Sequence, residues 1–147
     1  MLTDLAAPGY AVDAALYSEV NQFYAHHMHL LDAGLADEWA ATFTEDGVFA
    51  PQTLAEPVRG RASLAAGLRT TVTQLATDGE VHRHWHGMIT VRPDGDVLRV
   101  RCYALVIATR QGGASRIHRA CVCTDELVRV DGRLLVRHRV VTRDDLP

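Results

Sequence analysis

Three histidines alternate along one stretch of the chain, at His82, His84 and His86. On a β-strand, residues two apart share a face, so the three imidazoles would line up there. A histidine titrates near neutral pH and serves as an acid or base when it faces a pocket. We expect His84 to be catalytic and His86 to contact a substrate. In the alternative interpretation, His82 lies in water at the sheet rim and only His84 is deep.

The same three histidines raise the question of a metal site. Two histidines spaced in this way on a strand form a known zinc pattern when further ligands converge. The three positions together span about 13 Å on an extended strand, which is too far for one ion. A group such as His118 or Asp125 would have to complete the set. We expect no metal, and no sequence motif indicates any other cofactor.

A helix-like stretch earlier in the chain carries a second group of polar side chains. Tyr24 offers a hydroxyl to a ligand, although core packing with a satisfied hydroxyl is the alternative. His26, His27 and His29 point in different directions on a helix, and of these His27 shares the face of Tyr24 and could reach a pocket. Asp32, which precedes a glycine turn, is expected to bind local backbone.

Later stretches alternate in the period of β-strands. Arg101 could bind a carboxylate or enolate oxygen through its planar fork, or it could lie on the outer face or pair with an acid. One face of the following strand carries the side chains Arg119, Cys121, Cys123 and Asp125. An odd cysteine count without an export signal indicates reduced thiols.

The elements that must position these side chains follow from hydrophobic periodicity and turn residues. Three- and four-residue steps predict helices, and two-residue steps predict strands. The predicted helices span residues 13–33, 36–43 and 60–75. The predicted strands span residues 48–50, 80–91, 97–109, 115–130 and 133–142, with tight turns at 92–96 and 131–132. Three helices followed by an antiparallel meander predict an α+β fold.

Length and composition narrow the class of protein. A chain of 147 residues suits one domain, with residues 1–12 as a loose N-terminal arm. No apolar run is long enough to cross a bilayer, and no secretory signal is present, so we expect a cytoplasmic protein without a membrane partner. The net charge of −3 argues against a nucleic-acid partner. The chain contains no lysine, which excludes Schiff-base chemistry on that residue.

Several motifs resemble one superfamily over roughly residues 15–143. They are Leu30-Leu-Asp-Ala-Gly34, Asp37-Glu-Trp39, Phe43-Thr-Glu-Asp-Gly47, Arg83-His-Trp-His-Gly87, Asp125-Glu-Leu-Val-Arg-Val-Asp-Gly132 and Arg137-His-Arg139. Together they resemble the SnoaL-like branch of the nuclear-transport-factor-two-like superfamily, which includes scytalone dehydratase and the small subunits of ring-hydroxylating dioxygenases. The resemblance implies a cone-shaped domain, with three N-terminal helices packed on a strongly curved, mostly antiparallel sheet, and a homodimer joined through sheet faces.

The resemblance also implies roles for residues. His84 falls where the dehydratases place a pocket histidine. Their partner histidine on the next strand is replaced by Arg101, and Gly34 and Ala50 stand near their two pocket tyrosines. The face that carries Arg119, Cys121, Cys123 and Asp125 would line the pocket. Asp125 would then be a base for a carbon acid, as in the superfamily's polyketide cyclases, or else an ion-pair partner of Arg137 or Arg139.

Two functions remain open, because this scaffold hosts both enzymes and non-catalytic subunits. The first is a cofactor-free cyclase, dehydratase or isomerase acting on an aromatic or polycyclic, polyketide-derived molecule, with His84, Asp125 and Tyr24 as catalytic residues. The second is a non-catalytic ligand-binding protein or the accessory subunit of an oxygenase. Trp39, Phe43 and Phe49 could stack on a planar ligand, or they could be core residues, as aromatic side chains more often are.

Overall fold

The computed structural model describes Leu5 and residues 11–147, so the expected N-terminal arm lies mostly outside the described residues. The described part contains three helices and a six-stranded sheet. The helices are α2 (Ala14–Asp32), α3 (Ala36–Ala40) and α4 (Arg61–Asp78). The strands are β1 (Phe43–Pro51), β2 (Val58–Arg59), β3 (Glu80–Asp94), β4 (Val97–Arg110), β5 (Ser115–Val130) and β6 (Arg133–Arg143). The predicted α+β class is confirmed.

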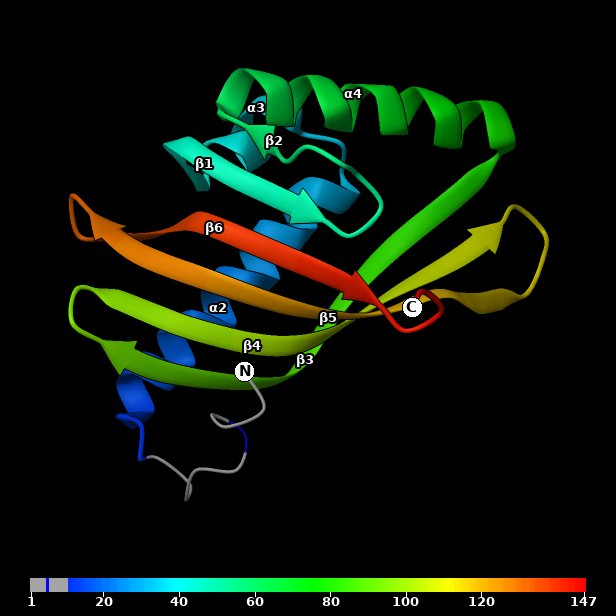
Figure 1. Cartoon of the computed structure of the whole chain (residues 1–147). Coiled ribbons are helices and arrows are strands. Elements are labelled where there is room, and N and C mark those ends of the chain that lie inside the picture. Colours follow the sequence, from blue (N-terminus) through cyan, green and yellow to red (C-terminus); the bar gives the residue numbers. More distant parts are fainter. Residues whose placement is uncertain (1–4, 6–10) are drawn as a thin grey trace.

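The sheet has the strand order β2-β1-β6-β5-β4-β3 and is strongly curved (Figure 1). Strands β3 to β6 form the predicted antiparallel meander, and β1 joins it by pairing parallel to β6. Strands β2 and β3 are the two edges, so the sheet does not close on itself. The last strand of the chain therefore lies inside the sheet rather than at an edge.

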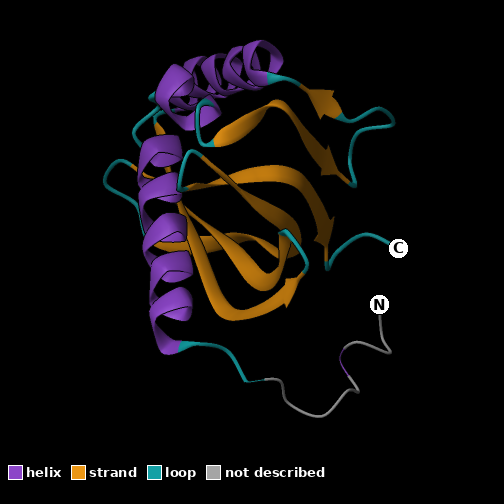
Figure 2. Cartoon of the chain, turned by 90° about the vertical axis from the view of Figure 1, so that its left-hand side faces the viewer, coloured by secondary structure: helices purple, strands orange, loops and turns teal. Residues whose placement is uncertain are grey.

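Helix α2 begins at a well-formed cap and buries one face against the sheet. The Asp13 carboxylate accepts hydrogen bonds from the backbone N–H groups of Ala15 and Leu16, which have no partner within the helix. The buried side chains recur at helical spacing: Val20, Tyr24, His27 and Met28. Figure 2 shows α2 running along one side of the curved sheet, with α4 across its top. None of the described helices is long and apolar enough to cross a membrane.

The region after α3 differs from the prediction. The helix ends at Ala40 rather than at residue 43, and the strand that was predicted over residues 48–50 already starts at Phe43. The reason is a distant partner: Val136 of β6 donates its backbone N–H to the Thr42 carbonyl oxygen at 2.9 Å, and Phe43 lies opposite Val136. The hydrophobic periodicity around residue 43 carries no information about a pairing with a strand so far away in sequence. Strand β2, which pairs with β1, was not predicted either.

The register of β3 to β6 decides which side chains face α2. Cys102 lies opposite Cys123, and His86 lies opposite Ala104, on the inner face. On the same face, Asp125 of β5 lies opposite a residue of β6, Arg139. A bulge between residues 87 and 90 bends β3 just beyond His86.

Candidate functional site

A pocket of about 290 Å³ opens between helix α2 and strand β3. Its polar lining consists of Asn21, Tyr24, His29, His84 and His86. The helix residues recur at three- and four-residue steps, so they share one face of α2. The histidines of β3 meet them because alternate residues of the strand point inward. The pocket thus combines two predicted histidines and the predicted tyrosine.

His84 is held by a carboxylate from the end of α2. The Asp32 Oδ1 atom lies 2.6 Å from His84 Nδ1, and Asp32 Oδ2 accepts the His84 backbone N–H at 3.0 Å. A carboxylate only accepts hydrogen bonds, so Nδ1 must carry a proton, and in the neutral ring Nε2 then has the lone pair. The expectation that Asp32 serves a local turn was wrong, because its partner lies 52 residues away in sequence.

Tyr24 belongs to a second, deeper cluster around Asp125. Tyr24 donates its hydroxyl to Asp125 Oδ2 at 2.5 Å. Arg139 donates from Nε to Oδ1 at 2.9 Å and from Nη2 to Oδ2 at 2.7 Å, and the Cys123 thiol donates to Oδ1 at 3.2 Å. The Asp125 carboxylate is therefore surrounded by four donors. Of the two alternatives for Asp125, the ion pair with Arg139 is present.

Burial and charge set the ionisation of this cluster. Burial alone would raise the pKa of Asp125, but the charge and hydrogen bonds of Arg139 outweigh it and keep that pKa below its ordinary value. Burial and the negative charge of Asp125 raise the pKa of Tyr24 well above its ordinary value. Asp125 is thus ionised and Tyr24 neutral, and the carboxylate anchors the phenol.

His27 extends the cluster away from the pocket. Its Nε2 atom lies 2.8 Å from Arg139 Nη1, and its Nδ1 atom lies 2.6 Å from the hydroxyl of Thr42. Thr42 donates that hydroxyl to the Trp39 carbonyl oxygen, so His27 must donate from Nδ1 and accept at Nε2. Burial and the Arg139 charge lower the pKa of His27 well below its ordinary value. His27 is a neutral support for Arg139 rather than a pocket residue.

The three alternating histidines have separate partners. His82 Nε2 lies 2.9 Å from a Glu80 carboxylate oxygen. His86 Nδ1 lies 3.4 Å from Cys102 Sγ, and its ring stacks on Tyr24 with centroids 5.6 Å apart. The three histidines on the inner face of β3 therefore lie in three different environments. Of the three, His84 and His86 line the pocket and His82 does not.

Several predicted substrate contacts lie elsewhere. Arg101 alternates with the inward Cys102 and so lies on the outer face of β4. Arg119 is exposed at the far end of β5. The rings of Trp39 and Phe43 are buried around His27, at centroid distances of 6.0 and 5.4 Å. Phe49 packs against the core, and Cys121 and Cys123 are buried on the inner face without lining the pocket.

Sequence reasoning missed two kinds of pocket residue. Asn21 and His29 line the pocket from α2, and helical spacing from Tyr24 was the signal that could have found Asn21. Asp32 carries no local signal, because its role depends on where β3 passes the end of α2. Its pairing with His84 is a product of the tertiary fold.

Comparison with known proteins places most of the chain in one family. The model of the SnoaL-like domain matches residues 12–140. ActVI-ORFA from Streptomyces coelicolor is 33% identical, covers 92% of this chain and 99% of its own, and superposes with a TM-score of 0.85. A protein from Catenulispora acidiphila, solved in complex with S-DNPA, is 36% identical over 90% of this chain and 96% of its own, with a TM-score of 0.81.

A more distant structure shares the fold. The beta subunit of a putative aromatic-ring-hydroxylating dioxygenase from Novosphingobium aromaticivorans is 20% identical, covers 92% of this chain and 94% of its own, and has a TM-score of 0.70. No curated protein sequence matches the chain.

Proposed function

The chain belongs to the SnoaL-like domain family, and from that premise we propose that it is a cytoplasmic enzyme that performs acid–base catalysis on an aromatic or polycyclic, polyketide-derived small molecule. The reaction class is cyclisation, dehydration or isomerisation. The catalytic base is His84, and Tyr24 binds and orients the substrate. Asp125 and Asp32 are positioning residues, each acting through the group that it holds.

One observation carries this proposal: Asp32 fixes the tautomer of a histidine that lines a pocket. Because both Asp32 oxygens bind His84, the ring is oriented, and among the described residues no hydrogen-bond partner is seen at Nε2, which carries the lone pair in the neutral ring. The His84 side chain is 27% exposed, so a ligand can reach it. A carboxylate that orients an imidazole also stabilises the imidazolium that forms when the base takes a proton.

The chemistry follows from that geometry. His84 Nε2 removes a proton from a carbon beside a carbonyl group, which leaves an enolate and an imidazolium. The imidazolium then returns the proton, either to another atom of the enolate or to a departing hydroxyl group. The first outcome is isomerisation and the second is dehydration. Asp125 has no free lone pair directed at the pocket, since four donors surround it, and this favours His84 as the base.

The pocket walls favour a substrate with a flat apolar body. Met28 and Ile89 supply apolar surface between the polar groups. The hydroxyl oxygen of Tyr24 accepts a hydrogen bond from a substrate hydroxyl, while the phenol keeps its own proton and donates it in a hydrogen bond to Asp125. The complex of a 36% identical relative with S-DNPA supports a small organic ligand at this scaffold.

The test uses two probes, S-DNPA for binding and 2-tetralone, an aromatic ketone with acidic α-hydrogens, for proton abstraction. We expect S-DNPA to raise the melting temperature of the wild type by mass action. We expect the wild type to accelerate exchange of the α-hydrogens of 2-tetralone in deuterated water, followed by nuclear magnetic resonance. His84→Ala should reduce that acceleration by about 10²- to 10⁴-fold.

His82→Ala is the matched control, because His82 lies on the same face of β3 but pairs with Glu80 outside the pocket. It should retain exchange activity. Equal exchange rates in the wild type and His84→Ala would remove His84 as the base. Binding of S-DNPA without any exchange would instead favour a carrier.

The second candidate function is a non-catalytic accessory subunit, favoured by the shared fold with a dioxygenase beta subunit. That likeness rests on 20% identity and speaks for the fold alone. An accessory subunit would need no oriented histidine in its pocket. Activity that appears only with a larger oxygenase subunit would support this second function.

We also propose a homodimer joined through the outer face of the sheet. Trp85, Tyr103 and Ile117 are 66%, 52% and 65% exposed on that face, and their strands are adjacent. Large apolar side chains exposed on one face of a sheet are a feature of interaction sites. Sedimentation analysis should show a dimer for the wild type and a monomer for Trp85→Asp; a monomeric wild type would contradict the proposal.

A further inference from the structure

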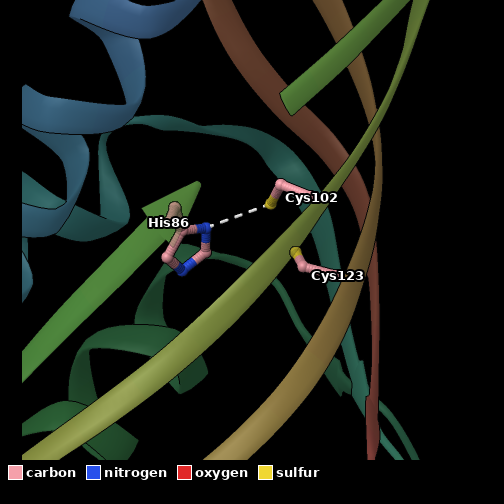
Figure 3. A group of neighbouring side chains, drawn as sticks. All are labelled: His86, Cys102 and Cys123. Atoms are coloured by element: carbon pink, nitrogen blue, oxygen red, sulfur yellow. Dashed lines mark hydrogen bonds between the residues drawn. The ribbon is translucent and has the colours of Figure 1, made fainter. Parts of the chain in front are cut away.

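Three side chains of types that can bind a metal converge on the inner face of the sheet (Figure 3). His86 comes from β3, Cys102 from β4 and Cys123 from β5, so three neighbouring strands each supply one ligand atom. The imidazole nitrogen and the two sulfur atoms all lie within 4.8 Å of one another. Both cysteines are at most 1% exposed, and His86 also lines the pocket.

The spacing is close to that of a tetrahedral zinc site. Zinc binds sulfur at about 2.3 Å and imidazole nitrogen at about 2.0 Å, which places the ligand atoms of one site roughly 3.5–3.8 Å apart. His86 Nδ1 and Cys102 Sγ are already 3.4 Å apart. The remaining separations close through small side-chain rotations, because the backbone register already sets Cys102 directly opposite Cys123.

The local charge favours a divalent, soft ion. Thiolate ligands select zinc or copper(I) over hard cations. Two thiolates and a neutral imidazole carry a charge of −2, so a divalent ion makes this buried site neutral, whereas copper(I) leaves it negative. Metal binding would remove the proton that Cys123 gives to Asp125, and Asp125 would keep its two bonds from Arg139.

We propose that His86, Cys102 and Cys123 form a zinc site with three protein ligands, of which His86 also lines the pocket. The ligand set departs from the expectation of no metal, which considered His82, His84 and His86 along one strand with a further group such as His118 or Asp125. Three ligands leave a fourth position for water or a bound molecule. The site does not include His84, so a failure of the zinc proposal would leave the proposed acid–base function of His84 untouched, and the reverse is also true.

The experiment titrates the reduced, full-length protein with cobalt(II), after treatment with a chelator and a phosphine reductant. We expect one cobalt per chain, a thiolate-to-cobalt charge-transfer band, and displacement of cobalt by zinc. Cys102→Ser and Cys123→Ser should each weaken cobalt binding by at least about 100-fold, since loss of a direct ligand exceeds the loss from a supporting residue. His86→Gln should weaken binding as well.

Cys121→Ser is the matched control: Cys121 is buried on the same face of β5, two residues from Cys123, but lies outside the cluster. It should bind cobalt like the wild type. X-ray absorption of zinc-loaded wild type needs no variant and should show two sulfur neighbours and at least one nitrogen. Absence of stoichiometric binding, equal loss in Cys121→Ser, or a zinc shell without sulfur would each overturn the site.

Discussion

Asp32 and Asp125 have the same side chain and opposite surroundings. Asp32 binds one histidine near the pocket mouth, with side chains 9% and 27% exposed for the aspartate and His84. Asp125 binds Arg139 with side chains 0% and 4% exposed, and it also accepts from Tyr24 and Cys123. The first carboxylate orients a group that can still react. The second is saturated and holds its surroundings in place.

The difference shows how a partner sets the role of a carboxylate. A histidine partner has a second nitrogen, so the effect of Asp32 passes through the ring to Nε2 and into the pocket. An arginine partner has a fixed charge and only donors, so nothing in the Asp125–Arg139 pair can exchange a proton near neutral pH. Substitutions in the two clusters should therefore affect different properties.

The largest expected effect is on stability, at Arg139. Arg139→Met leaves Asp125 buried without its counter-charge and leaves His27 Nε2 without a donor. Breaking a buried pair on one side destabilises by about 3–5 kcal/mol. Urea unfolding followed by circular dichroism measures the free energy of unfolding.

Arg137→Met is the control, because Arg137 pairs with Glu126 at the surface and its side chain is 46% exposed. It should change the free energy of unfolding by less than about 1 kcal/mol. If the two variants have the same free energy of unfolding, the buried Asp125–Arg139 pair does not stabilise the fold in the way proposed here.

A smaller effect, on activity rather than stability, is expected at Asp32. Asp32→Asn replaces one accepting oxygen by a donor, so His84 loses the partner that keeps its proton on Nδ1. The exchange rate of 2-tetralone should fall by about 10²-fold or more, with a loss of roughly 1 kcal/mol in stability. Asp37→Asn, at an exposed aspartate, should leave the rate unchanged. If Asp32→Asn lost much stability but kept the exchange rate, Asp32 would serve the stability of the fold rather than the activity of His84.

The smallest expected effect is on the pH dependence of stability, and it comes from His27. An unfolded histidine takes up a proton below about pH 6.5, while native His27 stays neutral because its pKa is lowered. The unfolded state then binds more protons, so stability falls with decreasing pH by up to about 1.4 kcal/mol per pH unit, until the native pKa is reached. Between pH 7.5 and 5.5 the wild type should lose about 1.4 kcal/mol more than His27→Gln. His26→Gln, at an exposed neighbour, should follow the wild type; equal slopes in all three proteins would refute a neutral buried His27.

Much of the fold was predictable, because its signals are local. Alternation along residues 80–142 and the turn residues between the strands gave the meander, and helical spacing gave α2. The N-terminal part of β1 was not predictable in this way. Phe43 is a strand residue because β6 lies beside it, and that partner is more than ninety residues away in sequence.

The site was predictable in its residue types and less so in their pairing. His84 and Tyr24 follow from spacing and resemblance, and both line the pocket. The outer position of Arg101 also follows from alternation once Cys102 is known to be inward. By contrast, Asp32 reaches His84 across 52 residues, and His86 meets two cysteines from separate strands. These contacts depend on the curvature and register of the sheet, which local sequence patterns do not reveal.

The interior position of β6 has a consequence for synthesis on the ribosome. Strands β5 and β1 both pair with β6, so the sheet stays in two parts until residues 133–143 have left the exit tunnel. Until then Asp125 has no arginine beside it, and the apolar face of α2 lacks part of its cover. The nascent chain therefore completes its core in one late step. A chain on a ribosome that pauses before β6 would be an aggregation-prone intermediate with exposed apolar surface that chaperones can bind.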